Sequence, residues 1–211
     1  MKIQLLSDVH LEHREACQIF IVDLEASCWD DREYGLSEME IIEIGAVLAT
    51  PDGRILDEFC TFVRPTLEPI LSQFCERLTS IRQRDIEQAP TYMEAMSCLD
   101  DWVSGRPGIW GSWGNYDFRQ FMEEESRLES GGAFLRMQHV NLKKAWRKTT
   151  GARRTSLLSA LEFHNMNFHG VHHRGIDDAR NISRLLQHID RHKLLSGVGE
   201  MQRGAERERA K

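Results

Sequence analysis

The chain has 211 residues, of which 41% are hydrophobic and 28% charged, as expected for one globular domain with a sizeable core. Its net charge of −6 argues against a general nucleic-acid coat protein, which is normally basic, but leaves room for an enzyme whose basic groups are local. No apolar stretch reaches the roughly 18 residues of a membrane-spanning helix, and five scattered cysteines without a CxxC pair favour reduced thiols in the cytoplasm over a zinc site.

The first half of the chain predicts three strands. Residues 1–15 form a separate lead-in segment, and residues 17–23 are almost continuously apolar, as expected for a strand that is covered on both faces. The runs 39–50 and 54–65 flank "PDG" at 51–53, which is a strong hairpin turn signal. The pattern therefore predicts three antiparallel strands.

Helices and two further strands are predicted after residue 65. A helical stretch, interrupted at 78–81 and 89–91, continues through "YMEAMSCLDDWV". "GIWGSW" (108–113) is the predicted fourth strand and leads into the helix "YDFRQFMEEESRL", and "MQHVNL" (137–142) is the predicted fifth strand. Short helices are expected to about residue 164, before a last helix from about Ile176 into the 190s.

This order of elements predicts one α/β domain over residues 16–194. We expect a mixed five-stranded sheet, in which three antiparallel strands are followed by parallel additions, flanked by helices. The tail 195–211 is polar and charged and is expected to be disordered.

Asp23 and Glu25 directly follow the apolar run at 19–22 and are the first candidate site residues. Residues i and i+2 of a strand project from the same face, about 7 Å apart, so the two carboxylates repel each other unless a cation lies between them. A D-x-E tripeptide is common, however. Taken alone, it is better explained by a Glu25 that turns to solvent and an Asp23 that caps a loop.

The segment "HHRGIDDARNISRLLQHI" (172–189) separates two neighbouring acids by their helical spacing. From Asp178, the steps i+4, i+7 and i+11 reach apolar residues, whereas from Asp177 the steps i+3, i+4 and i+7 reach polar ones. Asp178 is therefore predicted on the buried face and Asp177 on the solvent face. A buried carboxylate is costly unless it is paired or bound to metal. A salt bridge or a helix N-cap is the alternative, and one of these is expected for Asp177.

Asp117, in "SWGNYDFRQF" (112–121), follows the predicted fourth strand and opens a helix. Capping of that helix is a sufficient explanation for an aspartate at this place. Asp117 alone would therefore not be selected as a site residue.

Together, D-x-E on the first strand, an aspartate after the fourth strand and H-x4-D before the last helix resemble the signature of the DEDDh 3′–5′ exonucleases, a DnaQ-like family with an RNase H-like fold. The resemblance extends over 17–191, and its five residues are Asp23, Glu25, Asp117, His173 and Asp178. "DLEASCW", "EIIEIGAV" and "HHRGIDDARNI" are most similar to the branch of histone-mRNA and small-RNA 3′ exonucleases and their bacterial relatives. The family's common "LTGI" appears here as "LTSI", with Ser80 in the glycine position.

The resemblance implies hydrolysis of the terminal phosphodiester at the 3′ end of single-stranded RNA or DNA, with RNA preferred, and release of nucleoside 5′-monophosphates. It also implies two divalent cations, Mg²⁺ with Mn²⁺ as a substitute, because hard cations prefer carboxylate oxygens. Asp23 would bridge both ions, and Glu25 and Asp178 would hold the ion that activates water. Asp117 would act through water. No membrane partner is implied, and the oligomeric state is not determined by the sequence.

His173 is the general base that the resemblance implies, since an ordinary imidazole pKa of ~6.5 allows proton exchange near neutrality. His172 is a competing candidate. His173 is preferred because its spacing to the inward-facing Asp178 matches H-x4-D, whereas His172 has that spacing only to Asp177.

Three residues are candidates for contact with the terminal nucleotide. The resemblance places Leu78 and Thr79 against it, although a core position explains Leu78 equally well. Trp29 follows the D-x-E loop and is a candidate for stacking on a base.

The stretch "LKKAWRKTTGARR" (142–154) is the most basic part of the chain and includes Lys143 and Lys144. Such a stretch can bind phosphates while its tryptophan stacks on a base. For Trp146 the more common arrangement is favoured, a solvated basic helix face with the tryptophan packed inward.

Two other functions compete with the exonuclease. "MKIQLLSDVHLEH" resembles the opening of calcineurin-like metallophosphoesterases, but "GNY" (114–116) stands in place of their "GNH" and no full ligand set can be assembled. A nuclease-like RNA-binding adaptor without catalysis is the second. All five DEDDh positions are filled, which favours the enzyme.

Overall fold

The computed structural model describes residues 18–129 and 131–198. The lead-in segment 1–15, with its phosphoesterase-like "SDVH", and residues 199–211 of the tail lie outside the described residues. Within the described ranges, no helix has the length and apolar character that a membrane crossing requires.

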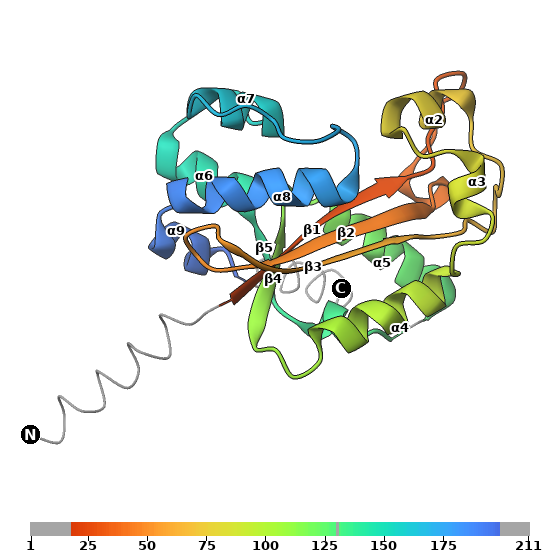
Figure 1. Cartoon of the computed structure of the whole chain (residues 1–211), viewed down its shortest axis with the longest axis horizontal. Coiled ribbons are helices and arrows are strands. Elements are labelled where there is room, and N and C mark those ends of the chain that lie inside the picture. The colour runs from red at the N-terminus through yellow and green to blue at the C-terminus, as the bar shows by residue number, and fades with distance from the viewer. Residues whose placement is uncertain (1–17, 130, 199–211) are drawn as a thin grey trace, which may run out of the picture.

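Five strands form one mixed sheet in the order β3-β2-β1-β4-β5, which confirms the predicted sheet (Figure 1). The first three strands are antiparallel, and the last two add parallel to β1. The strands are β1 (Gln18–Ala26), β2 (Ile41–Ala49), β3 (Ile55–Phe62), β4 (Gly108–Ser112) and β5 (His139–Asn141).

Helices cover both faces of the sheet, as predicted. In Figure 1, α6, α7 and α8 lie above the sheet, α4 and α5 lie below it, and α2 and α3 lie beside one end. The helices are α2 (Gln73–Thr79), α3 (Gln83–Ile86), α4 (Tyr92–Val103), α5 (Tyr116–Leu128), α6 (Leu142–Thr150), α7 (Leu157–Phe163), α8 (Gly175–Leu185) and α9 (Arg191–Ser196). Short 3₁₀ turns are η1 (Leu36–Glu38), η2 (Phe134–Arg136) and η3 (Leu186–His188).

β1 is buried on both faces, which explains its continuous apolar run. Ile19 and Ile21 pack into the core beneath α6, α7 and α8, whereas Phe20 and Val22 pack into the core formed with α4 and α5. β1 is longer than predicted because it continues to pair with β2 through Glu25. Asp23 and Glu25 therefore lie within the strand and point from the same face.

The single helix predicted from about Ile176 into the 190s is wrong. α8 ends at Leu185 and is followed by η3, and Ile189 then adopts an extended conformation. The Asp190 carboxylate accepts a hydrogen bond from the Lys193 backbone N–H and begins α9. The apolar spacing continues across this break because Ile189 and Leu194 both pack into the same core, so periodicity alone did not reveal it.

Two glycines bring the first turn of α8 against the sheet. A Cβ atom at Gly45 of β2 would lie 2.1 Å from the carbonyl carbon of Gly175, and one at Gly175 would lie 2.7 Å from the carbonyl oxygen of Asp23. Any side chain at either position would push the helix away. This close backbone approach places the start of α8 next to the acidic residues of β1.

Candidate active site

One cavity of about 330 Å³ contains all five residues of the predicted catalytic set. Its lining includes Asp23, Glu25, Asp117, His173 and Asp178. The set comes from β1, from the first turns of α5 and α8, and from the loop before α8. The fold therefore brings together residues that are up to 155 positions apart in the sequence.

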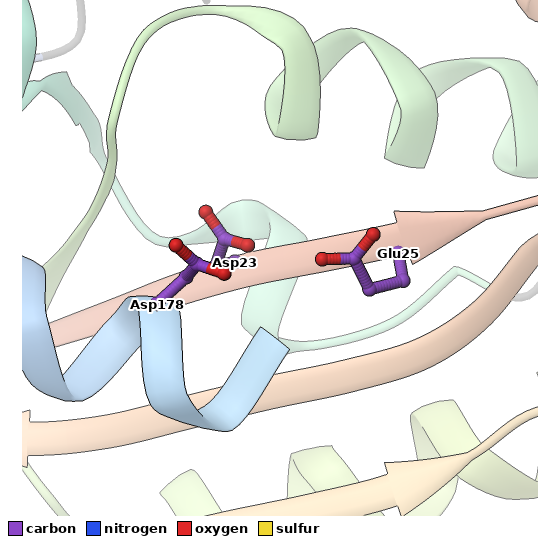
Figure 2. Close-up of side chains that lie close together, drawn as sticks. All are labelled: Asp23, Glu25 and Asp178. Carbon is purple, nitrogen blue, oxygen red and sulfur yellow. The ribbon is translucent and has the colours of Figure 1, made fainter. Parts of the chain in front are cut away.

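Three carboxylates lie at the centre of this cavity. Asp23 and Glu25 project from β1, and Asp178 projects toward them from α8 (Figure 2). Each offers an oxygen, and these oxygens lie within 4.8 Å of one another. Asp178 is only 3% exposed, which confirms that it lies on the buried face of its helix.

Asp117 is bound to the same strand rather than used as a helix cap. Its Oδ1 accepts a hydrogen bond of 3.1 Å from the backbone N–H of Leu24, the residue between Asp23 and Glu25. The N-cap position of α5 belongs to Asn115. The capping explanation for Asp117 is therefore wrong, and the structure places its carboxylate at the site.

Burial and mutual repulsion raise the pKa of these acids. Burial, followed by the charges of Asp117 and Asp178, raises the pKa of Asp23 well above its usual range. Burial, followed by Asp178, raises the pKa of Glu25 to about 9. Burial also raises the pKa of Asp117 to about 6, against the opposing effect of the Leu24 N–H. Four carboxylates in such a site cannot all ionise without added positive charge.

The donor set fits hard divalent cations. Every candidate ligand is a carboxylate oxygen, which suits Mg²⁺ or Mn²⁺ rather than the softer metals that take sulfur ligands. A bound cation would offset the repulsion that raises these pKa values, since a nearby opposite charge favours the ionised form.

Two adjacent histidines meet Asp178 at the cavity. His172 Nδ1 lies 2.9 Å from Asp178 Oδ1, and the backbone N–H of His173 donates to Asp178 Oδ2 at 2.8 Å. The two imidazole rings stack with centroids 4.0 Å apart. Burial, followed by the charge of His172, lowers the pKa of His173. The sequence spacing that favoured His173 did not reveal the contact between the His172 ring and Asp178.

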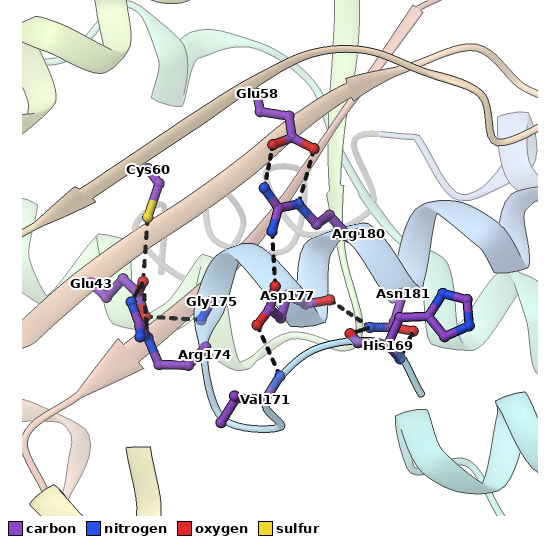
Figure 3. Close-up of polar contacts among 10 residues, drawn as sticks. All are labelled: Glu43, Glu58, Cys60, His169, Val171, Arg174, Gly175, Asp177, Arg180 and Asn181. Atoms are coloured by element: carbon purple, nitrogen blue, oxygen red, sulfur yellow. Dashed lines mark hydrogen bonds and ion pairs between the residues drawn. The ribbon is translucent and has the colours of Figure 1, made fainter. Parts of the chain in front are cut away.

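The loop that carries the histidines is fixed by the first turns of α8 (Figure 3). The Asn181 side chain accepts a hydrogen bond from the backbone N–H of His169 and donates one to its carbonyl oxygen. Asp177 accepts a hydrogen bond of 2.9 Å from the backbone N–H of Val171 and pairs with Arg180. Of the two roles expected for Asp177, a salt bridge or a helix N-cap, the structure shows the salt bridge.

Glu43 is a site neighbour that the sequence did not indicate. It lies opposite Glu25 in the β1–β2 register and is fully buried. Arg174 donates to it from Nε at 3.1 Å and Nη2 at 2.9 Å, and the Gly175 backbone N–H donates at 3.0 Å (Figure 3). Glu43 is thus charge-compensated by protein, unlike the cavity acids. A glutamate inside the apolar run "EIIEIGAV" is the signal that could have pointed to it.

Leu78 and Thr79 line the same cavity, at the end of α2. Leu78 is 36% exposed, so the explanation of Leu78 as a core residue is wrong. Ser80, which follows, has a left-handed backbone with φ 60°. Glycine adopts this conformation without strain, which gives a physical reason for a glycine in the related "LTGI" sequences.

The remaining candidate residues lie outside the cavity lining. The Arg32 guanidinium covers the Trp29 ring at 4.1 Å from its centroid. Lys143 lies at the edge, beside Gly114, and Lys144 is exposed on α6. Trp146 is fully buried, which confirms its inward packing. The cavity instead contains Trp113, which sequence reasoning did not select.

Comparison with known proteins agrees with this geometry. The exonuclease family model (RNase T type) matches residues 20–186. The 3′–5′ exonuclease eri1 of Schizosaccharomyces pombe is 27% identical over an alignment 198 residues long, and the match covers 80% of this chain and 66% of that protein. The 3′–5′ exoribonuclease 1 of Mus musculus is 30% identical over an alignment 183 residues long, and the match covers 79% of this chain and 51% of that protein.

A solved structure shares both fold and family. The nuclease domain of 3′hExo, a DEDDh family member bound to rAMP, has a TM-score of 0.72 at 27% identity, covering 86% of this chain and 94% of that one. The present chain spans only part of the length of the yeast and mouse relatives. With a family model over most of its length and the five signature residues gathered in one cavity, this chain belongs to the DEDDh 3′–5′ exonuclease family.

Proposed function

We propose that this protein is a 3′–5′ exoribonuclease that removes nucleotides from the 3′ end of single-stranded RNA and releases nucleoside 5′-monophosphates. The observation that carries the proposal is the cavity in which four carboxylates and His173 converge beside Leu78 and Thr79. Two findings support RNA rather than DNA as the substrate. Several relatives are named exoribonucleases, and the related 3′hExo domain binds a ribonucleoside monophosphate. The scattered cysteines favour the cytoplasm as its location.

Asp23, Glu25 and Asp178 would hold two divalent cations, Mg²⁺ with Mn²⁺ as a substitute, and Asp117 would complete the site. When bound, such a pair of ions lowers the pKa of a water molecule and stabilises the leaving oxygen of an in-line displacement. The contribution of the protein is to hold the carboxylates together against their repulsion. The Leu24 N–H fixes Asp117, and the close approach of Gly45 and Gly175 fixes Asp178.

His173 would accept the proton of the attacking water. Its lowered pKa keeps the imidazole neutral near pH ~7, which is the form that accepts a proton. His172 has its Nδ1 engaged with Asp178, so we assign it a positioning role in which it stacks on the ring of His173. Leu78 and Thr79, which line the cavity at the end of α2, would contact the terminal nucleotide.

Cleavage of end-labelled oligonucleotides tests the proposal. Single-stranded RNA and DNA labelled at the 5′ end would be incubated with Mg²⁺, with Mn²⁺ and with EDTA. A metal-dependent ladder that shortens from the 3′ end, with 5′-monophosphate products and faster loss of RNA, is expected. Asp23→Asn should abolish the ladder, whereas Asp101→Asn, an exposed aspartate of α4, should leave it unchanged.

Two results would replace the proposal by another function. Binding of RNA without cleavage would indicate an adaptor. Release of phosphate from a small phosphomonoester, without a ladder, would indicate a phosphoesterase.

A further inference from the structure

Positive charge is concentrated in one segment of this acidic chain. Residues 130–161 contain seven lysines and arginines and no aspartate or glutamate, although the whole chain carries a net charge of −6. Six of the seven lie on α6 and the loop that follows it: Lys143, Lys144, Arg147, Lys148, Arg153 and Arg154. We call residues 143–154 the basic track.

Both ends of the basic track adjoin the active-site cavity. At the start, Lys143 Nζ lies 3.2 Å from the position that a Cβ atom on Gly114 would occupy, three residues before Asp117. At the other end, the carbonyl oxygen of Thr155 accepts a hydrogen bond of 2.9 Å from the indole N–H of Trp113. Trp113 lines the cavity, as does Leu157. The track therefore leaves the cavity wall along α6 and returns to it.

The three arginines of the track and Lys143 are available to a ligand. Arg147, Arg153 and Arg154 are exposed, and Arg147 and Arg153 line a surface hollow of about 370 Å³ with Gly151. Within residues 18–129 and 131–198, no carboxylate lies within 4.0 Å of Lys143 or of these three arginines. By contrast, Arg174 and Arg180 each form an ion pair with a glutamate, Glu43 and Glu58 respectively.

Helix stability explains only part of this charge pattern, since Arg147 and Lys148 lie in the last turn of α6, where the helix dipole favours positive charge. Lys143 and Lys144 occupy the first turn of α6, where the helix dipole disfavours positive charge. Lys143 and Arg147 are like charges at i and i+4, which costs a few tenths of a kcal/mol. Trp146 is buried in the core, whereas Lys144 and Arg147 are exposed and Lys143 is half-buried. A surface of this kind suits a polyanion.

We propose that the basic track binds the phosphates of the substrate strand upstream of its 3′-terminal nucleotide. This inference rests on the proposed exonuclease function and specifies its substrate as a single-stranded polynucleotide of several residues. Binding through phosphates is independent of base sequence and depends strongly on salt.

Length dependence and salt dependence together test the track. The substrates are a diribonucleotide, which has no phosphate upstream of the scissile one, and a long oligoribonucleotide. In Arg147→Gln/Arg153→Gln, the ratio of kcat/KM for the long substrate to that for the diribonucleotide should fall about tenfold. The slope of log kcat/KM against log salt should become shallower by about 0.7 for each phosphate that the variant no longer binds. The matched control is Arg54→Gln/Arg84→Gln, which removes two exposed arginines outside the track and should keep the wild-type ratio.

The outcomes separate this inference from the function beneath it. A wild-type protein that cleaves neither substrate would refute the exonuclease itself. A wild-type protein that cleaves both, with the same length ratio and salt slope in both double variants, would refute the basic track and leave the exonuclease standing.

Discussion

The guanidinium of Arg174 donates two hydrogen bonds to the fully buried carboxylate of Glu43. Arg174 directly follows His173 in the chain, and Glu43 lies opposite Glu25 in the sheet. The ion pair therefore joins the histidine loop to the strand beside the cavity acids. Its partners are 131 positions apart, and no local pattern would pair them.

Removal of Arg174 should be costly because it leaves the Glu43 charge buried without a partner. For Arg174→Gln we expect a loss of about 3 kcal/mol in the free energy of unfolding, at the low end for a buried pair because Arg174 is 27% exposed. Urea unfolding measures it. Glu43→Gln/Arg174→Gln should recover part of the loss. Arg106→Gln breaks an exposed pair with Asp57 and should cost less than about 1 kcal/mol. Equal losses for the two single variants would contradict this account.

Gly45→Ala should move the first turn of α8 and disturb the site. The added methyl would meet the backbone of Gly175 at 2.1 Å, and backbone cannot rotate away as a side chain does. We expect a loss of about 1–3 kcal/mol in the free energy of unfolding, as for an overpacked core, and weaker Mn²⁺ binding because Asp178 shifts. Unfolding and metal titration measure the two effects. Gly35→Ala, at an exposed and open position, is the control. If Gly45→Ala matches this control in both measurements, α8 is not fixed by the glycine contact.

The two histidines should differ in their effect on catalysis. His173→Gln should lower kcat about 10²–10⁴-fold, the usual contribution of a general base, with little change in the melting temperature. His172→Gln should cause a smaller loss, since it removes a stacked ring and the hydrogen bond to Asp178. Single-turnover cleavage of labelled RNA compares them. A larger loss in His172→Gln would transfer the role of base to His172.

The stability of the metal-free protein should fall as pH rises. The pKa of Asp117 is raised to about 6 and that of Glu25 to about 9, so the folded state holds protons that the unfolded chain releases at lower pH. The stability that these groups contribute is complete below their ordinary pKa values and is lost as pH rises through 6 and then 9. Melting in EDTA from pH ~6.5 to ~9 measures it. Burial lowers the pKa of His139 to about 3, so His139 opposes this fall only near its unfolded pKa of ~6.5, where the unfolded chain still binds a proton, and the fall is read most clearly above pH ~7.5.

Divalent cations should reverse this fall, because binding displaces the protons from the carboxylates. The rise in melting temperature with excess Mg²⁺ or Mn²⁺ should therefore be larger near pH ~8.5 than near pH ~6.5. Glu25→Gln, which removes one titrating ligand, should flatten the pH dependence in EDTA and reduce the metal effect. A melting temperature that responds neither to pH nor to metal would refute the cation site.

The sequence by itself determined the elements whose pattern is local. Alternation along β1 placed Asp23 and Glu25 on one face, and helical spacing in α8 separated Asp178, which lies toward the sheet, from Asp177, which is more exposed. Strand and helix periods depend only on backbone geometry, so they can be read without knowledge of the fold. The resemblance at the five DEDDh positions depended on the same local segments.

Only the tertiary structure decided which distant groups meet. Asp117 binds the Leu24 N–H across 93 positions rather than capping its helix. The ring of His172 contacts Asp178, although the H-x4-D spacing had paired Asp178 with His173. The end of α8 at Leu185 was likewise not visible in the sequence, since the apolar spacing continues to Ile189, which packs into the same core. Such contacts depend on how strands and helices pack, which backbone periodicity does not specify. The sequence therefore identified the acids, whereas packing alone set the partners that hold them.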